Sequence, residues 1–458
     1  MKVIVCGAGQ VGSNIARYLS GENADVTVVD RSPELVHKIT DSLDVKGLVG
    51  FASHPDVLDE AGADDADMVV AVTQADEVNM VACQICHSIF EVPTKIARIR
   101  HQSYLADNWS ALFSRDNMPI DHIISPEVEV ARAISRRLQI PGAFDVIPLA
   151  DGKVSLIGVH CTEDTPILNT PLRQLTAMFP DLQIVIVGIR RGEKGIVPSA
   201  DDELKLGDDV YFVAETAHLR RAMTAFGHEE QEARRIVLVG GGNVGLNLAQ
   251  RVERASPHVS LKLIEHDKQR AERAAETLDR TVVIHGSALD TDILEEANVR
   301  RAEGIVAVSN DDEVNILSSL LAKRYGCSRA VTLVNKTSYG PMVSSLGIDT
   351  VVNPRAITVS SILQFVRRGR IRSVHSLSDG FGELVEAEAL ETSSLVGVPI
   401  RDVNLPTGVM IGAVVRGETV IIPRGQTVVR AGDRVIIFAT TPSVKKVERL
   451  FSVKLEFF

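Results

Sequence analysis

The chain lacks a long apolar run. No stretch approaches the roughly 18 consecutive apolar residues that a membrane-spanning helix needs. The apolar runs are of strand length, such as "LQIVIVGI" from Leu182. The first of them begins within two residues of Met1, which leaves no room for a signal peptide before it. We therefore expect a cytoplasmic protein, unless a partner tethers it to a membrane.

Cysteine is scarce, and its pattern excludes a disulfide framework. The chain has 5 cysteines, an odd number that fits a reducing compartment. Cys83 and Cys86 match C-x-x-C, but no second ligand pair or redox context accompanies them. Their neighbours Val78, Val81 and Ile85 recur at helical spacing, so we interpret both thiols as buried small hydrophobic groups. A redox role is the alternative.

Basic charge is also lacking. Lysine and arginine total 49 against 60 aspartate and glutamate residues, a formal net charge of −11. The densest basic run, "RRGRIR" from Arg367, is short. A nucleic-acid interface needs a basic face that neutralises phosphates, so the composition argues against one.

Internal repetition organises the chain. Five stretches of the first half have counterparts in the same order in the second half. The pairs are "GAGQVGSNIA" (7–16) with "GGGNVGLNLA" (240–249), "VLDEAG" (57–62) with "ILEEAN" (293–298), "AVTQADEVNM" (71–80) with "AVSNDDEVNI" (307–316), "IDHIISPEVEVARAI" (120–134) with "IDTVVNPRAITVSSI" (348–362), and "RGEKGIVPSADDELKLGDDVYFVA" (191–214) with "RGETVIIPRGQTVVRAGDRVIIFA" (416–439). The protein is a tandem duplication of one two-domain unit.

Each unit opens with apolar runs that alternate with helical stretches. In the first half we predict helices over 9–19 and 76–90, and strands over 2–6, 25–29, 68–72, 95–99 and 122–124. Such alternation predicts a parallel sheet covered on both faces. Short β runs separated by turns then indicate a small α+β domain. The fold class is two Rossmann-like, doubly wound parallel-sheet domains, each followed by a small α+β domain, with domains over 1–125, 140–225, 232–352 and 366–452.

The two glycine motifs carry the chemistry. "GAGQVG" and "GGGNVG" each follow an apolar strand and open a helix, the context that gives a G-x-G-x-x-G motif its meaning. Gly7 would make the tight turn, Gly9 would let backbone N–H groups approach a pyrophosphate, and Gly12 would allow close packing of the helix. The helix N-terminus offers unpaired donors and a positive dipole end to the phosphate.

An acidic residue ends the next predicted strand of each half. Asp30 closes "DVTVVD" and Glu265 closes "LKLIE". Each carboxylate would accept hydrogen bonds from adenosine ribose hydroxyls and repel a 2′-phosphate. NAD(H), or an adenine nucleotide such as ATP or ADP, is therefore favoured over NADP. Glycine-rich turns that pack without a ligand are the alternative.

Polar residues follow the next strand in each half. Thr73 and Ser309 lie where a parallel sheet binds ligands and offer hydroxyl and backbone groups to a nucleotide. Carboxylates come next in both halves, at Asp76, Glu77, Asp311, Asp312 and Glu313. We interpret them as first-turn residues that offset the helix dipole and cap its N–H groups, with a hard-cation site as the weaker alternative.

The halves differ in one cationic residue. "KIARIR" places Arg98 where it could reach phosphates, with a surface ion pair as the alternative, whereas the second half has Leu333 at this position. The two sites are therefore chemically unequal. His54, in "ASHPDVLDEAG", has no histidine counterpart, and we interpret it as a loop residue beside a helix start.

Catalytic constellations are missing from the repeated pattern. No Ser-His-Asp, lysine-centred or zinc-ligand arrangement occurs in both halves, and we predict no catalytic residue and no metal site. The nucleotide is better read as a signal than as a reagent. An NAD-dependent oxidoreductase with an unrecognised substrate pocket is the alternative. A scaffold protein is a third possibility, in which the two phosphate-binding glycine turns, or cradles, are vestigial.

Together these stretches resemble the TrkA family, the peripheral regulatory subunits of bacterial Trk potassium uptake systems. The resemblance covers essentially the whole chain. It rests on "MKVIVCGAGQVG", "GADDADMVVAVTQADEVNMVACQ", "RIR" from Arg98, "GGGNVG" and "VVRAGDRVIIFATTPSVKKVERLF". In this family an RCK (also called KTN) domain precedes a C-terminal companion, and the pair is duplicated.

The resemblance implies a non-catalytic regulator. It implies binding of NAD(H) and of ATP or ADP, assembly of a homo-oligomeric ring, expected as a tetramer, and docking on the cytoplasmic face of a TrkH- or TrkG-type potassium-translocating subunit. Carried over residue by residue, it implicates in cofactor binding Gly7, Ala8, Gly9, Gln10, Val11, Asp30, Thr73, Gln74, Arg98, Gly240, Gly241, Gly242, Asn243, Val244, Glu265, Ser309 and Asn310. Leu333 puts the phosphate contact of the second site in doubt.

Overall fold

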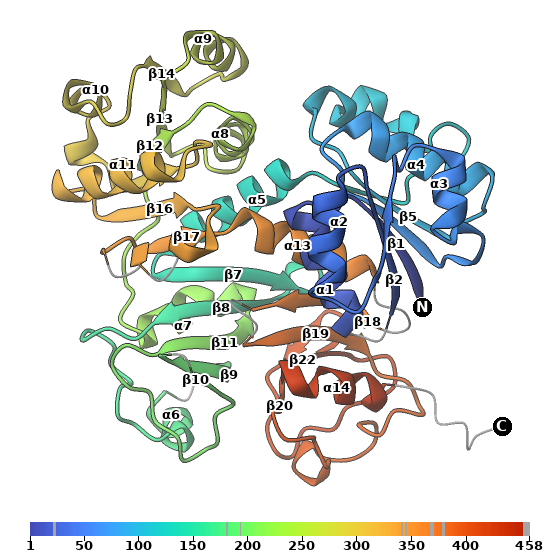
Figure 1. Ribbon diagram of the computed structural model, residues 1–458. Coiled ribbons are helices and arrows are strands. Elements are labelled where there is room, and N and C mark those ends of the chain that lie inside the picture. Colours follow the sequence, from blue (N-terminus) through green and yellow to red (C-terminus); the bar gives the residue numbers. More distant parts are fainter. Residues whose placement is uncertain are drawn as a thin grey trace.

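The computed structural model describes residues 1–21, 24–179, 182–192, 194–339, 342–343, 346–366, 371–377 and 381–451. Four sheets form from the chain in sequence order, two parallel and two antiparallel. Figure 1 shows the two parallel-sheet domains above and the two antiparallel sheets below them. Within the described ranges, no helix is both long and apolar enough to span a bilayer.

The first domain is a six-stranded parallel sheet with strand order β3-β2-β1-β4-β5-β6. Its strands are β1 (Lys2–Cys6), β2 (Asp25–Asp30), β3 (Lys46–Val49), β4 (Met68–Ala71), β5 (Thr94–Arg98) and β6 (His122–Ile124). Its helices are α1 (Gln10–Gly21), α2 (Pro33–Thr40), α3 (Pro55–Glu60) and α4 (Asp76–Ser88), followed by α5 (Pro126–Gln139). The order reverses between β1 and β4, which is the point where open α/β sheets bind ligands.

The third sheet repeats this topology in the order β14-β13-β12-β15-β16-β17. Its strands are β12 (Arg235–Val239), β13 (Ser260–Glu265), β14 (Val282–His285), β15 (Gly304–Ala307), β16 (Arg329–Leu333) and β17 (Thr350–Val352). Its helices are α8 (Asn243–Ala255), α9 (Lys268–Thr277), α10 (Thr291–Glu296) and α11 (Asp312–Arg324), followed by α13 (Pro354–Val366).

Each parallel-sheet domain precedes a five-stranded antiparallel sheet, in the orders β10-β9-β11-β8-β7 and β18-β19-β22-β20-β21. The strands of the first are β7 (Ala143–Leu149), β8 (Val154–His160), β9 (Ile184–Arg191), β10 (Lys194–Ile196) and β11 (Asp209–Glu215), with α6 (Leu172–Met178) and α7 (Leu219–Ala225). Those of the second are β18 (Ile371–Ser376), β19 (Gly382–Glu388), β20 (Val409–Arg416), β21 (Thr419–Ile421) and β22 (Arg434–Thr440), with α14 (Val444–Leu450). The predicted fold class is confirmed.

Strand β3 was not predicted from the sequence. The five strands predicted for the first half all form, but the sheet has a sixth, β3. This strand lies at the sheet edge, contains Gly47, and none of its residues is buried. A short, half-exposed edge strand carries neither the apolar run nor the alternation by which strands are recognised.

Two helices cross between the halves. Helix α5 leaves the first domain, and its residues Val130 and Ile134 pack in the core of the second, against Leu248 of α8. Helix α13 leaves the second domain and packs Ile362 on the first, against Ile15 of α1. Each glycine-motif helix is therefore covered by a helix from the other half (Figure 1).

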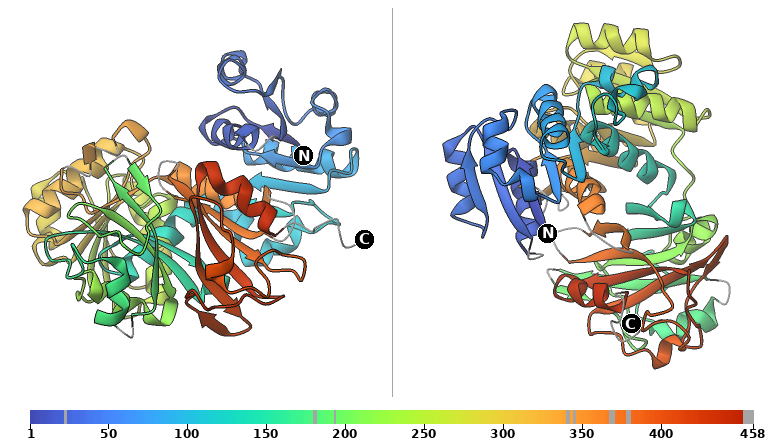
Figure 2. Two further views of the ribbon diagram at one scale, coloured as in Figure 1. Left: turned by 90° about the horizontal axis from the view of Figure 1, so that it is seen from below. Right: turned by 90° about the vertical axis from the view of Figure 1, so that its right-hand side faces the viewer.

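The two antiparallel sheets pack against each other. One apolar cluster joins residues of both, including Leu156 and Tyr211 from the first sheet and Ile436 and Phe438 from the second. Figure 2 shows both small domains on the same side of the molecule. The halves are thus joined at two levels, by exchanged helices and by a sheet-on-sheet core.

Candidate nucleotide-binding sites

The first and last glycines of each motif occupy positions that exclude a side chain. Gly7 has φ +113° and Gly240 has φ +101°, conformations that favour glycine. A Cβ on Gly12 would lie 1.8 Å from the carbonyl oxygen of Gly7, and one on Gly245 would lie 1.9 Å from that of Gly240. The first and last glycines therefore let the helix begin directly on the turn.

The middle glycine of each motif faces open space. A Cβ on Gly9 or on Gly242 would meet no protein atom within 4 Å. No side chain caps the N-terminus of α8, and the adjoining Gln10 and Asn243 are exposed. Uncapped N–H groups beside an open space suit an anionic group such as a phosphate. The residues present therefore fit a pyrophosphate at both motifs.

The acidic residues of the second strands are bound to the glycine turns. Asp30 accepts hydrogen bonds from the backbone N–H of Ala8 at 2.7 Å and of Ser32 at 2.8 Å. Glu265 accepts from the N–H of Gly241 and, at 2.8 Å, from that of Asp267. Each carboxylate fixes the turn and retains lone pairs for a further donor, because an ionised carboxyl offers about four acceptor positions. Ribose binding by these acids stays a prediction.

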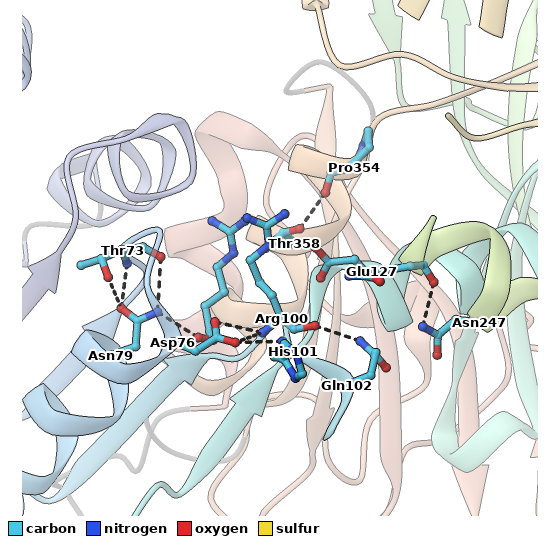
Figure 3. Close-up of polar contacts among 12 residues, drawn as sticks. Thr73, Asp76, Asn79, Arg100, His101, Gln102, Glu127, Asn247, Pro354 and Thr358 are labelled. Atoms are coloured by element: carbon cyan, nitrogen blue, oxygen red, sulfur yellow. Dashed lines mark hydrogen bonds and ion pairs between the residues drawn. The ribbon is translucent and has the colours of Figure 1, made fainter. Parts of the chain in front are cut away.

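A buried asparagine next to each glycine motif was not predicted from the sequence. Asn79 has no exposed surface, and its Oδ1 accepts from the Thr73 N–H at 2.8 Å and the Thr73 hydroxyl at 2.7 Å. Its Nδ2 donates to the Arg98 carbonyl at 2.9 Å (Figure 3). One amide thereby ties the ends of β4 and β5 together.

Asn315 repeats this arrangement in the second half. Its Oδ1 accepts from the Ser309 N–H at 2.8 Å and from the Ser309 hydroxyl at 2.7 Å, and its Nδ2 donates to the Leu333 carbonyl at 3.0 Å. The sequence "DEVN" recurs in both halves and could have indicated a shared role for this asparagine. It belongs to the repeated stretches 71–80 and 307–316.

Asp76 and Asp312 lie in the first turns of α4 and α11, as predicted, but their side chains do not cap these helices. Asp76 accepts from the N–H groups of Arg100 and His101, at 2.9 and 2.8 Å, so it holds the loop after β5 rather than capping α4 (Figure 3). Asp312 likewise accepts from the N–H of Lys336, at 2.8 Å. Only Asp311 matches the capping interpretation, accepting from the Val314 N–H at 2.9 Å. Capping was therefore the wrong interpretation of Asp76 and Asp312.

Arg98, the last residue of β5, places a positive charge at the edge of the first candidate site. Its Nε is buried and has no hydrogen-bond partner among the described residues. Burial and the neighbouring charge of Arg100 lower the pKa of its guanidinium. An anionic oxygen would satisfy this group. At the matched position Leu333 is buried in the core, so the second site has no equivalent cation.

The remaining predicted residues line or flank the cradles. Gln74 and Asn310 are exposed, and Val11 and Val244 are partly buried beside the turns. Within the described ranges, no group of three or more histidine, cysteine or acidic side chains could hold a metal ion. His54 lies directly before α3, where its side chain caps no N–H group.

The C-x-x-C thiols lie in a core. Cys83 and Cys86 are fully buried on α4 and unpaired, and burial raises the pKa of Cys86 to about 12. Reactive thiols need access and a lowered pKa. The interpretation as small hydrophobic groups is confirmed.

Family models cover both halves of the chain. The TrkA-N domain model matches residues 3–126 and 236–354, and the TrkA-C domain model matches 156–227 and 384–452. The chain is 53% identical over 458 residues to the "Trk system potassium uptake protein TrkA" of Azorhizobium caulinodans, with 100% of both chains covered. It is 42% identical over 462 residues to the protein of that name from Halomonas elongata, again with 100% of both covered.

Solved structures share the fold. The chain is similar to the structure described as "GsuK Channel", with a TM-score of 0.62 and 18% identity over 98% of this chain and 78% of that one. It is similar to the "GsuK channel bound to NAD", with a TM-score of 0.59, 18% identity and the same coverage. The "GsuK RCK domain" matches with a TM-score of 0.60 and 18% identity, over 98% and 94% of the two chains.

Proposed function

The chain belongs to the TrkA family of Trk system potassium uptake proteins, and from this premise we propose that it is the nucleotide-sensing subunit that gates a TrkH- or TrkG-type membrane potassium transporter. Its ligands are NAD(H) and ATP or ADP. It works as a homo-oligomeric ring, a tetramer, on the cytoplasmic face of the membrane. Its domains span 1–125, 140–225, 232–352 and 366–452.

The open space at Gly9 and Gly242 carries the proposal. Both positions offer free volume at the start of a glycine-motif helix, and the first adds the unpartnered Nε of Arg98. Backbone N–H groups, a helix dipole and a cation are the chemistry that binds a pyrophosphate. A channel of the same fold is bound to NAD, which supports a nucleotide over a free anion.

In this proposal the nucleotide acts as a signal. The carboxylates beside each glycine motif accept hydrogen bonds from the backbone of the turn, and Asp76 and Asp312 of the next helices hold loops, so these acids support the site's structure. A ligand shifts the ring between conformations only through its different affinity for the two. NAD and NADH, or ADP and ATP, carry different charge to the site and so bias that equilibrium.

The test is nucleotide-dependent potassium flux in vesicles that hold the membrane subunit, with binding measured on the same protein. Gly9→Ala with Gly242→Ala fills the ligand space without touching protein atoms, so we expect binding and the flux response to fall at least tenfold at an unchanged melting temperature. Gly21→Ala is the matched control, because a Cβ there also meets nothing within 4 Å.

Two outcomes contradict the proposal. Nucleotide titration that leaves both ring conformation and flux unchanged removes the signalling role. Sustained NADH oxidation with a small metabolite would favour an NAD-dependent oxidoreductase instead.

A further inference from the structure

Four arginine side chains gather where α5 of the first half packs along α8 of the second. We call them the arginine cluster: Arg132 and Arg136 on α5, Arg251 and Arg254 on α8. Residues three or four apart share a helix face, so the two members of each pair are neighbours. The apolar residues Ile134 and Leu248 join the same two helices in one core.

The members of the cluster lie close enough to repel each other. Burial and the charge of Arg132 lower the pKa of Arg136 to about 10. The charges of Arg137 and Arg251 lower this pKa too, whereas Glu129 raises it. Burial and the charge of Arg132 likewise lower the pKa of Arg251. The guanidinium groups of the two helices therefore stand within electrostatic reach of one another.

The cluster has too few carboxylates to neutralise it. Arg132 pairs with Glu129 at 2.7 Å. Among the described residues, no ion pair or hydrogen bond is made by the side chain of Arg136, Arg251 or Arg254. Arg136 and Arg251 are partly buried, and a charge taken from water without an opposite charge costs free energy. This excess of cations occurs in a chain whose formal net charge is −11.

The matched helices of the other half pack without any arginine in these places. At the matched positions, α1 and α13 carry four uncharged residues: Tyr18, Gly21, Ser360 and Gln364. These two helices still form the equivalent core, with Ile362 packed on Ile15. Packing of the helix pair therefore does not require guanidinium groups, and the fold alone does not explain the arginine cluster.

The cluster is separate from the glycine motif that opens α8. Arg251 follows Asn243, the first residue of α8, by eight residues, which is about 12 Å along the helix axis. Arg136 lies near β18 of the second small domain, because its charge contributes to the low pKa of His375. The side chain of Arg132 is 41% exposed, so a solute can reach the cluster from water.

We propose that the arginine cluster binds a phosphate group, held between Arg136 of α5 and Arg251 of α8. The ligand is a small dianion, either inorganic phosphate or the phosphate monoester of a soluble compound. The proposal does not rest on nucleotide binding at the glycine motifs.

The chemistry of the guanidinium group suits this ligand. Each guanidinium presents a planar fork of N–H donors that matches a pair of phosphate oxygens. A dianion would neutralise the two unpaired groups and remove the repulsion between them. Because Arg136 and Arg251 are partly buried, a compact anion fits them better than the surface of an acidic protein. Once bound, the anion would join α5 of one half to α8 of the other.

The experiment measures binding of inorganic phosphate to the full-length chain by calorimetry, with chloride at the same ionic strength as the reference. The background is Gly9→Ala with Gly242→Ala, so that phosphate at the glycine motifs does not contribute. We expect saturable binding that falls at least tenfold in Arg136→Gln and in Arg251→Gln, the scale of hydrogen bonds to a charged group. Arg273→Gln, exposed on α9, is the matched control and should bind phosphate normally.

Stability distinguishes a ligand site from a structural role. In phosphate-free buffer, Arg136→Gln should melt at the same temperature as the unaltered chain or higher, because it relieves repulsion. Phosphate should raise the melting temperature of the unaltered chain but not that of the variant. Phosphate should also slow amide hydrogen exchange in residues 132–137 and 251–255. Arg136→Lys, which keeps the charge but loses the planar fork, should bind with intermediate affinity.

Two results overturn the proposal. One is phosphate binding that is absent, or that persists unchanged in both glutamine variants. The other is a melting temperature of Arg136→Gln that is lower with and without phosphate, with unchanged binding, since that assigns the arginines a structural role.

A second arm identifies the source of the phosphate group. Vesicles of phosphatidylglycerol in phosphatidylcholine are sedimented with the same variants. We expect no cosedimentation that depends on Arg136 or Arg251. Cosedimentation lost in both glutamine variants, without binding of inorganic phosphate, would overturn the soluble ligand and assign the cluster to a lipid headgroup.

Discussion

At the scale of single residues, the buried side-chain amide of Asn79 or Asn315 positions the backbone at each candidate site. Asn79 uses its oxygen for the Thr73 N–H and hydroxyl and its nitrogen for the Arg98 carbonyl. It thereby fixes the spacing between Thr73, which lies against the glycine turn, and Arg98. A rigid supporting contact of this kind positions residues that touch the ligand.

Asn79→Ala should destabilise the first parallel-sheet domain by about 2–3 kcal/mol, because it leaves the Thr73 N–H and the Arg98 carbonyl buried and unpaired. Denaturant unfolding followed by hydrogen exchange of β4 and β5 measures the loss. The exposed Gln74→Ala is the control. An unchanged unfolding midpoint for Asn79→Ala would show that water replaces the amide without cost.

His375 makes stability depend on pH. Burial and the charge of Arg136 lower its pKa to about 4, although Asp145 and Glu386 oppose them. An unfolded histidine titrates near 6.5, so the unfolded chain binds the proton first as the pH falls. The contribution of neutral His375 is complete above about pH 6.5 and declines by up to about 1.4 kcal/mol per pH unit toward pH 4.

His375→Asn should flatten this part of the stability profile between pH 4 and 6.5. Urea unfolding at half-unit pH steps measures the slope, and the exposed His54→Asn is the control. Equal slopes for His375→Asn and the unaltered chain would assign the pH dependence to other groups.

The site could be predicted only in part from single residues. The glycine spacing, the acids after the second strands and the difference between Arg98 and Leu333 are local or repeated patterns. Asn79 looks like an ordinary helix residue in the sequence. Its role depends on its partners at the ends of β4 and β5, which only the folded chain brings together.

At the scale of elements, the exchange of α5 and α13 links each half to the other. Each helix follows the last strand of its own parallel sheet, β6 or β17, and then packs on the glycine-motif helix of the other half. Sequence could not predict the exchange. The apolar residues of the two helices would serve equally well for packing within one half.

Ile134→Ala therefore has its effect in the opposite half. Ile134 is fully buried in the core that includes Leu248 of α8, and its truncation should cost about 2–5 kcal/mol. Hydrogen exchange should show lost protection in α8 and β12, not in α1 and β1. Ile362→Ala is the reciprocal variant and should expose α1. Loss of protection within the mutated half would contradict the exchange.

At the scale of the whole molecule, the two halves are held together by many contacts besides the linker that joins them. The antiparallel sheets share an apolar core, with ion pairs from Lys153 to Glu418 at 2.8 Å and from Arg434 to Asp151 at 2.6 Å. The Ala150 N–H donates to the buried Glu386 at 3.0 Å. The connecting stretch Glu229–Gln231 is exposed.

Cutting the linker should leave the molecule assembled. With a protease site inserted within Glu229–Gln231, the two cleaved halves should co-elute in size-exclusion chromatography, because two exchanged helices and one shared core still hold them. The melting temperature should fall by only a few degrees. Halves that separate after cleavage at micromolar concentration would show that the linker, and not the interface, keeps them together.

The linker then has a role other than stability. Two copies of a single half would always carry identical sites, and every substitution in one would appear in the other. Joining the halves in one chain guarantees that each pairs with a partner of different sequence. Mutation can then change one half without changing the other, as the difference between Arg98 and Leu333 shows, so the duplication lets two once-equal halves diverge while they remain packed against each other.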